Sequence, residues 1–214
     1  MKAKYSILSL LNWKKLKTLL SFGTKGYLAD IGWIDSYDNQ SSVDAHGDPL
    51  PWVTYSFIDF IKDRISDQHL VFEFGSGSST LFYAKRAKAV VSVEHDQEWL
   101  NKISAQKPAN AEMIFAELEA NGAYSQMPVS TGKQYDIIIV DGRDRVNCCM
   151  NALPALSQTG VLVLDDSERD FYLPAIDFLK KSGFRELSFS GISPGLFYYK
   201  TTSVFYRSAN CLGI

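Results

Sequence analysis

From residue 51 onward, short apolar runs alternate with segments whose apolar residues recur at helical spacing. The short runs predict strands at 70–74, 89–94, 112–116, 135–141, 161–165, 184–190 and 201–207. Helical spacing predicts helices at 52–65, 79–87, 97–106, 146–156 and 173–181. Continuously apolar strands separated by helices are typical of a parallel sheet covered on both faces. We therefore predict an α/β fold.

The end of the chain departs from this alternation. Residues 191–200, which include Pro194 and Gly195, are all that separates the last two predicted strands. This span suits an antiparallel return but is barely long enough for a helical crossover. The predicted sheet is therefore mostly parallel, with one antiparallel strand near the C-terminus. The segment that contains Gly122 and Pro128 is expected to be a loop.

Residues 1–50 have a different character from the rest of the chain. Lysines interleave with apolar residues there, and the apolar positions 8, 11, 16, 19 and 20 approximate one helical face. Residues 36–51 are polar and predict a loop. We divide the chain into a basic helical extension with a polar loop, residues 1–50, and a main domain, residues 51–214.

Charge is unevenly distributed along the chain. The net charge is −2, yet six lysines and no acid precede Asp30, which leaves 16 basic and 24 acidic residues, a net −8, in the remainder. Such a body lacks the basic face that phosphate contacts require, so we expect no nucleic-acid partner. For residues 1–29 two interpretations stay open. The helix packs on the protein's own core, or it docks on an anionic membrane surface or on another protein.

The three cysteines, Cys148, Cys149 and Cys211, are too few for a disulfide framework and lack the spacing of a zinc site. This usage fits a reducing compartment, so we expect the cytoplasm, including a peripheral place at the inner face of a membrane. Cys148 and Cys149 lie on a predicted helix, where we expect them to pack in the core.

Acidic residues recur where the predicted strands end. In open α/β sheets, ligands bind beyond the carboxyl ends of the strands. A buried carboxylate is costly unless it is paired, so repeated acids at one edge predict a shared ligand, with exposed loop ends as the alternative. The candidate residues are Glu73, Gly75, Ser76, Gly77, Ser78, Ser79, Glu94, His95, Glu117, Leu118, Asp141, Arg143, Asp165 and Asp166.

The glycine-rich loop discriminates between ligand classes. A dinucleotide-binding loop has the pattern G-x-G-x-x-G, whereas Thr80 stands here in place of the third glycine. Glu73, two residues before Gly75, would repel a diphosphate and attract an ammonium group. Glu94, at the end of the next strand, is placed to accept hydrogen bonds from ribose hydroxyls. These residues predict a nucleoside ligand with a cationic amino-acid portion.

Four motifs resemble those of class I S-adenosylmethionine-dependent methyltransferases: FEFGSGSST, VVSVEHDQEW, YDIIIVDG and SQTGVLVLDD. The resemblance covers about residues 52–207, and the strings GDPLPWVTY and DGRDRVNC also resemble uncharacterised bacterial methyltransferase-like proteins. It implies a Rossmann-like, doubly wound, seven-stranded sheet and S-adenosylmethionine as cofactor. It further implies that Glu73 lies near the methionine amino group, that Gly75 and Gly77 approach the cofactor, and that Glu94, beside His95, holds the ribose.

The same resemblance implies roles for residues farther along the chain. Glu117 and Leu118 would flank the adenine, and Asp141 would lie beside the sulfonium. Methyl transfer to a hydroxyl requires the loss of the hydroxyl proton. A base can accept this proton, or a metal ion can lower the pKa of the hydroxyl. Asp141 is therefore a candidate catalytic residue, together with Arg143, which is placed to clamp an anionic group of the acceptor. Ion pairing with nearby acids is the alternative for this arginine.

Asp141, Asp165 and Asp166 resemble the magnesium site of catechol O-methyltransferase-like enzymes. In that family an aspartate after the fourth strand joins an Asp-Asn pair after the fifth. This sequence has Asp-Asp instead, and it lacks the lysine that the family places just after its fourth-strand aspartate. The resemblance admits Mg²⁺ at these three residues. The alternative is that Asp165 and Asp166 cap the next helix.

Together these features predict a methyltransferase that acts on a small-molecule, hydroxyl-bearing acceptor, with a saccharide as one candidate. Two other functions stay open. The protein could be a non-catalytic cofactor-binding scaffold recruited through its basic extension. It could also be an aminopropyltransferase-like enzyme, because Asp141 and Asp144 weakly resemble the fourth-strand motif of spermidine synthases.

Overall fold

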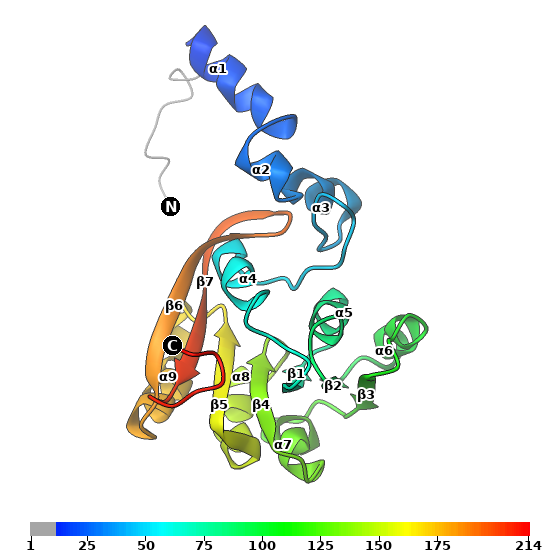
Figure 1. Cartoon of the computed structure of the whole chain (residues 1–214), viewed down its shortest axis with the longest axis vertical. Helices are drawn as coiled ribbons and strands as arrows, with labels where there is room; N and C mark the ends of the chain where they lie inside the picture. Colours follow the sequence, from blue (N-terminus) through cyan, green and yellow to red (C-terminus); the bar gives the residue numbers. More distant parts are fainter. Residues whose placement is uncertain (1–11) are drawn as a thin grey trace.

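The computed structural model describes residues 12–214, which contain a seven-stranded sheet of order β3-β2-β1-β4-β5-β7-β6 (Figure 1). β7 runs antiparallel to both β5 and β6, whereas the pairs among β1 to β5 are parallel. This confirms the α/β class, the Rossmann-like mostly parallel sheet and the antiparallel strand near the C-terminus. The strands are β1 (Leu70–Phe74), β2 (Ala89–Glu94), β3 (Ala111–Phe115), β4 (Tyr135–Val140), β5 (Leu156–Asp165), β6 (Arg185–Ser193) and β7 (Leu196–Tyr206).

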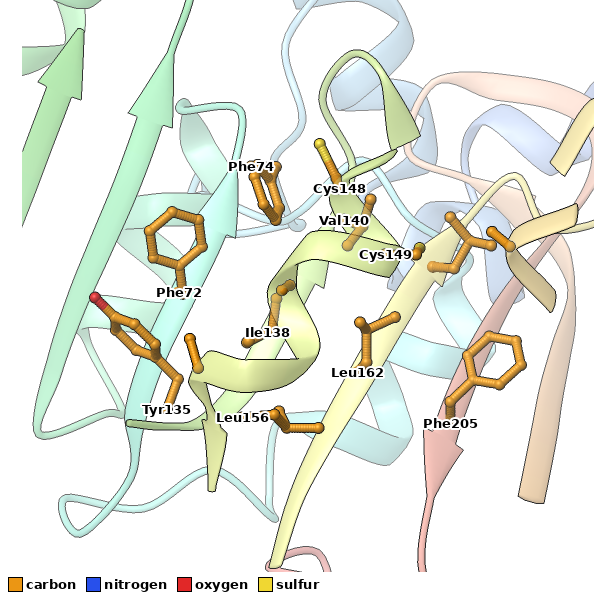
Figure 2. Close-up of a cluster of buried hydrophobic side chains, with 14 of the residues drawn as sticks. Phe72, Phe74, Tyr135, Ile138, Val140, Cys148, Cys149, Leu156, Leu162 and Phe205 are labelled. Carbon is orange, nitrogen blue, oxygen red and sulfur yellow. The ribbon is translucent and has the colours of Figure 1, made fainter. Parts of the chain in front are cut away.

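Successive residues of the central strands pack into apolar layers on opposite faces of the sheet. In β4, Ile137 packs with the layer that holds α4 and α5, and Ile138 packs with the layer that holds α7, α8 and α9 (Figure 2). Both faces are therefore covered, which explains why the central strands are apolar at most positions on both faces. The helices are α4 (Tyr55–Ile61), α5 (Ser78–Ala84), α6 (Gln97–Ser104), α7 (Ala123–Ser130), α8 (Arg145–Ala152) and α9 (Leu173–Lys181).

The cysteines behave as the sequence predicts. Cys148 and Cys149 belong to α8, and their free thiols are buried in the apolar layer shown in Figure 2. Cys211 is also a free thiol. Burial raises the pKa of Cys149 to about 12. Packing in the core is confirmed for the adjacent pair.

Before the sheet, the described chain forms α1 (Trp13–Leu20), a 3₁₀ turn (Ser21–Gly23), α2 (Tyr27–Asp30) and α3 (Trp33–Asn39). α1 buries none of its residues and projects away from the sheet (Figure 1), so this helix does not pack on the core. The predicted apolar positions 8 and 11 lie outside the described residues. α3 overturns the prediction of a loop at 36–39, because the helix continues until Gln40 closes it in the left-handed conformation. In residues 12–214, no helix is both long and apolar enough to cross a membrane.

Two further predictions were wrong in the second half of the chain. The expected loop around Gly122 and Pro128 contains α7, with Pro128 inside the helix. Pro128 and Tyr124 are buried there, so packing outweighs the backbone hydrogen bond that proline removes. The helix predicted to reach residue 156 ends at Ala152, because the chain turns at Leu153–Ala155, around Pro154, and enters β5 at Leu156.

The hairpin of β6 and β7 is longer than predicted. Its strands continue to Ser193 and from Leu196, so Pro194 and Gly195 form the turn instead of a loop across residues 191–200. The tip reaches α3 and the segment before α4 (Figure 1). Trp33 Nε1 donates to the carbonyl of Leu196 at 2.9 Å, and Trp52 Nε1 donates to that of Pro194 at 2.6 Å. The hairpin therefore ties the N-terminal part to the sheet.

The loops after β1 and β4 approach each other at Gly75 and Gly142. A Cβ atom at Gly142 would overlap the hydroxyl oxygen of Tyr124 and would lie 3.0 Å from the backbone nitrogen of Gly75. Tyr124 is fully buried against β1, so neither neighbour can retreat easily. Gly142 is required for these loops to meet.

Gly142→Ala should lower the free energy of unfolding by about 1–3 kcal/mol, as overpacking of a close contact does. Thermal denaturation should show a melting temperature several degrees below that of the wild type. Gly23→Ala is the matched control, because no atom lies within 4 Å of a Cβ built there. Equal melting temperatures for the two variants would contradict this packing.

Candidate functional site

A cavity of about 360 Å³ opens at the carboxyl ends of β1, β2 and β4. It brings together the predicted residues from Glu73 to Ser79 with Glu94, His95, Asp141 and Arg143. Its remaining lining residues are Gln40, Ser41, Ser42, Leu50, Trp52, Phe74, Trp99, Gly142 and Arg145. Glu117 and Leu118 are exposed on the loop after β3 and do not line it. Their predicted contact with adenine stays a prediction.

Glu73 lies at the base of this cavity, at the end of the buried strand β1. Its side chain is almost completely buried, and Thr80 Oγ1 donates to its Oε2 at 2.6 Å. Burial raises the pKa of Glu73 to about 8, although hydrogen bonds from Ser79 and Thr80 oppose the shift. The ligand-free carboxyl is therefore mostly neutral at pH 7. A cation placed beside it would favour its ionised form.

Glu94 fastens the glycine-rich loop to the end of β2. Its Oε2 accepts from the backbone nitrogen of Ser76 at 3.0 Å and from the Ser76 hydroxyl at 3.2 Å. Its Oε1 accepts from the backbone nitrogens of His95 and Asp96 at 2.8 and 3.0 Å. His95 Nδ1 also lies 2.8 Å from Oε1, but without hydrogen-bond geometry. A ligand hydroxyl can reach this carboxylate by displacing the rotatable Ser76 hydroxyl.

Trp99 is a lining residue that the sequence prediction missed. Its indole Nε1 donates to the carbonyl of Ser76 at 2.7 Å, which places the ring beside Gly77. The signal was present in the sequence, since Trp99 stands in the motif VVSVEHDQEW and its helix begins just after β2. Residues 40–42, assigned to the extension, also line the cavity. The extension and the main domain thus share this site.

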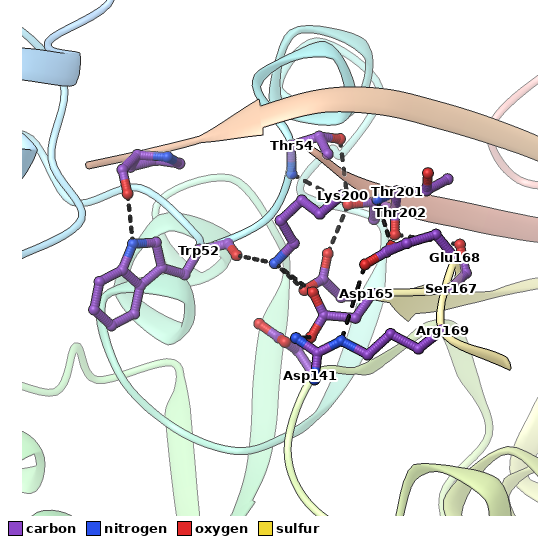
Figure 3. A network of polar contacts seen from close by, with 12 residues as sticks. Trp52, Thr54, Asp141, Asp165, Ser167, Glu168, Arg169, Lys200, Thr201 and Thr202 are labelled. Carbon is purple, nitrogen blue, oxygen red and sulfur yellow. Dashed lines mark hydrogen bonds and ion pairs between the residues drawn. The ribbon is translucent and has the colours of Figure 1, made fainter. Parts of the chain in front are cut away.

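Asp141, Asp165 and Asp166 lie together, as predicted, but two cations, Lys200 and Arg145, lie among them. Figure 3 shows Lys200 between Trp52 and Asp165. Lys200 Nζ lies 2.6 Å from Asp165 Oδ2 and 3.0 Å from Asp166 Oδ1, and it donates to the carbonyl of Trp52 at 3.0 Å. Burial lowers the pKa of Lys200, but Asp165 and its neighbouring acids outweigh that effect, so the pKa is raised. Lys200 is a charged lysine with all three donors in use.

Arg145 is the second cation of this cluster. Its Nη2 lies 3.0 Å from Asp141 Oδ1, and its Nη1 lies 3.3 Å from Asp166 Oδ2 and donates to the carbonyl of Asp165. Burial raises the pKa of Asp141 well above its ordinary value, and Asp165 raises it further, against the opposing effect of Arg145. Arg145 therefore favours the ionised form of Asp141, against burial and Asp165.

The three acids do not form a metal site. Asp165 Oδ1 accepts from Thr202 Oγ1 at 2.7 Å and its Oδ2 faces Lys200, so both oxygens already have partners. Among residues 12–214, no group of three or more His, Cys, Asp or Glu side chains is arranged to hold a metal ion. A divalent cation here would meet the Lys200 ammonium. The helix-cap alternative is not seen either, because no side chain caps α9.

The other two arginines near the cavities, Arg169 and Arg143, differ in whether they form ion pairs. Arg169 Nη2 lies 2.8 Å from Asp166 Oδ2, and its Nε lies 3.9 Å from Glu168 Oε1. Arg143 is exposed at the cavity, and its guanidinium makes no ion pair within the described part of the chain. Asp144 accepts from Asn121 and Asn147 outside the cavity, so it is not placed to hold an amine there.

A second cavity, of about 410 Å³, adjoins the first. The two share Trp52, Asp141 and Arg145. Lys200, Tyr198 and Tyr199 of β7 and the segment from Asp165 to Arg169 form much of its wall. Asp141 thus stands where the two cavities meet.

Neither protein-family models nor curated protein sequences match this chain. Solved structures do match. A methyltransferase-like protein from Silicibacter pomeroyi DSS-3 aligns over 74% of this chain and 89% of its own, with 21% identity and a TM-score of 0.56. An rRNA methylase from Streptococcus thermophilus aligns over 70% and 93%, with 17% identity and a TM-score of 0.52.

A third match is the precorrin-6y C5,15-methyltransferase from Geobacter metallireducens GS-15. It aligns over 80% of this chain and 96% of its own, with 15% identity and a TM-score of 0.53. The fold is that of class I S-adenosylmethionine-dependent methyltransferases, as the motifs predict. Proteins with this fold act on different acceptors, so the reaction has to be argued from the site.

Lys200→Met should destabilise the protein strongly, because it removes the nearer of the two cations beside the buried Asp165 and leaves only Arg145, at 3.8 Å. Breaking such a pair typically costs about 3–5 kcal/mol, which thermal denaturation would detect. Lys181→Met, at an exposed lysine, is the matched control. The wild type should show the same melting temperature in EDTA and in MgCl₂. A wild type that Mg²⁺ stabilises and EDTA destabilises would contradict the assignment of Lys200 as the resident cation.

Proposed function

We propose that this protein transfers the methyl group of S-adenosylmethionine to a small-molecule acceptor. The observation that carries the proposal is the position of Asp141, which lines both the cavity of the glycine-rich loop and the adjoining cavity. A methyl group that passes from a cofactor in the first cavity to an acceptor in the second has to pass this residue. The fold supports the choice of cofactor.

In this proposal the first cavity holds the cofactor. Glu73 binds its ammonium group, which ionises the carboxyl, and Glu94 accepts from a ribose hydroxyl in place of the Ser76 hydroxyl. Trp99 and His95 form the side of the cavity toward β2, and we place the adenine beyond them, toward Glu117 and Leu118. The bound cofactor supplies an electrophilic methyl group on a cationic sulfur.

Asp141 is the proposed catalytic base. A lone pair of the acceptor oxygen would form the new bond to the methyl carbon as the carbon–sulfur bond breaks. The electron pair of the carbon–sulfur bond would stay on sulfur and neutralise its positive charge. The hydroxyl proton passes to Asp141, and the ion pair with Arg145 favours the ionised form that a base requires. Arg145 holds the carboxylate in place by its ion pair with Asp141, whereas Arg143 lines the cofactor cavity and not the adjoining one. No metal takes part, because Lys200 and Arg145 already neutralise these acids.

The second cavity supports a neutral, hydroxyl-bearing acceptor. The aromatic rings of Trp52, Tyr198 and Tyr199 offer flat surfaces, and carboxylates between them offer hydrogen-bond acceptors. Sugar-like rings have apolar faces and hydroxyl edges that match such a wall. The net charge of −8 on the chain after residue 29 also disfavours a nucleic-acid acceptor. Aminopropyl transfer is not favoured, because Asp144 lies away from the cavity.

Binding of S-adenosylhomocysteine should release a proton from Glu73. With a pKa of about 8, this carboxyl is protonated at pH 7 in the free protein and ionised beside the ammonium. Calorimetry in buffers of different ionisation enthalpy should give close to one more proton released for the wild type than for Glu73→Gln at pH 7. The difference should vanish above about pH 9. No difference between the two proteins at pH 7 would rule out this contact.

Transfer of labelled methyl groups tests catalysis against a scaffold role. Wild-type protein with methyl-labelled S-adenosylmethionine and a panel of saccharides and phenols should produce labelled acceptor and S-adenosylhomocysteine. Asp141→Asn should bind S-adenosylhomocysteine but lose at least a hundredfold in rate, the usual effect of removing a general base. Tight cofactor binding without transfer to any compound would favour the scaffold, and full activity of Asp141→Asn would exclude Asp141 as the base.

A further inference from the structure

α1 is an amphipathic helix whose apolar side is uncovered. Trp13, Leu16 and Leu20 fall on one side of the helix by their spacing. Lys14 and Lys15 fall on the opposite side, and Lys17 lies at the edge of the apolar side, one turn after Trp13. Trp13 and Leu20 are 73% and 70% exposed, and the helix buries none of its residues. Apolar side chains gathered at one exposed site mark an interaction surface. The described chain itself provides nothing that covers it.

The apolar surface continues into the turns that follow α1. Phe22 is 44% exposed and Tyr27 is 58% exposed, and both line a shallow, largely apolar cavity next to Lys25. Residues 12–29 hold four lysines, Lys14, Lys15, Lys17 and Lys25, and not one acid. The surface formed by Trp13 to Tyr27 is therefore both apolar and uniformly basic.

A protein partner is a poorer match for this surface than a lipid bilayer. The remainder of the chain carries a net charge of −8. Because it is covalently joined to α1, its acidic groups are available to the lysines of α1 at a high effective concentration. Nevertheless α1 projects away from it (Figure 1) and buries nothing against it. An identical second copy offers the same acidic surface. An anionic bilayer offers both a repeated negative charge for the lysines and an apolar layer for Trp13, Leu20 and Phe22.

We propose that residues 13–27 bind the surface of an anionic lipid membrane. α1 lies in the plane of the interface, with Trp13, Leu16 and Leu20 directed into the acyl region and with its lysines at the headgroups. Tryptophan and tyrosine favour this boundary, because their rings are apolar with a polar edge. The proposal concerns recruitment to a surface and is independent of the methyl-transfer reaction.

Full-length protein should co-sediment with vesicles of phosphatidylcholine and phosphatidylglycerol at low salt. We expect at least tenfold weaker binding to phosphatidylcholine vesicles alone, and a similar loss in high salt, because screening removes the attraction of the lysines. Trp13→Ser/Leu20→Ser should weaken binding at least tenfold, and so should Lys14→Gln/Lys17→Gln. Lys88→Gln/Lys181→Gln changes the net charge equally at exposed lysines outside the segment and should bind as the wild type does.

Several outcomes would overturn the proposal. Failure of the wild type to bind the anionic vesicles would refute it. Equal effects of the two lysine pairs on binding would show that the attraction is not specific to α1. A lower melting temperature for Trp13→Ser/Leu20→Ser would show that α1 packs on its own core. Sedimentation of a dimer that this variant dissociates would assign the surface to a second copy. Unchanged melting temperatures of the α1 variants, together with their loss of vesicle binding, would support it.

Discussion

Lys200 and Arg145 make the carboxyl edge of the sheet possible. Three acids converge where β4 and β5 end, and burying them unpaired would cost several kcal/mol each. Lys200 reaches them because β7 is antiparallel to β5, which places its residue 200 near Asp165, while Thr202 of the same strand donates to Asp165 Oδ1. Arg145 reaches them from the first turn of α8. The position of β7 beside β5 therefore also determines which cation neutralises the acids, and this is the constraint on the site.

This constraint also explains why the site resembles a metal centre in sequence but not in structure. A divalent cation and a lysine–arginine pair can both balance clustered carboxylates, but they leave different groups free. Here the charge is supplied by side chains that are fixed by the fold, with Lys200 also bonded to the carbonyl of Trp52. Asp141 is the acid that keeps access to both cavities. A metal centre would instead present open coordination positions to the acceptor.

Much of the fold and of the first cavity could be predicted from the sequence, because strand periodicity and the glycine-rich loop are local signals. Glu73, Glu94 and Asp141 are each placed by the end of a strand. Lys200 could not be placed, because its role depends on pairing across 35 residues of chain, and the sequence pattern put it in the connection before the last predicted strand. α7 was missed because the burial of Tyr124 and Pro128 outweighs the local preference of proline.

The base and the tip of the β6–β7 hairpin make different interactions. Its base continues the sheet and carries Lys200 into the acid cluster, whereas its tip accepts hydrogen bonds from Trp33 and Trp52 and supports α3 through the Trp33–Phe197 contact. Tyr198 and Tyr199, which line the second cavity, lie between these ends. The aromatic wall of that cavity is therefore held on two sides, by Trp33 and Trp52 at the tip of the hairpin and by the acids that pair with Lys200. The shape of the second cavity thus depends on two tryptophans that precede the first strand of the sheet in the chain.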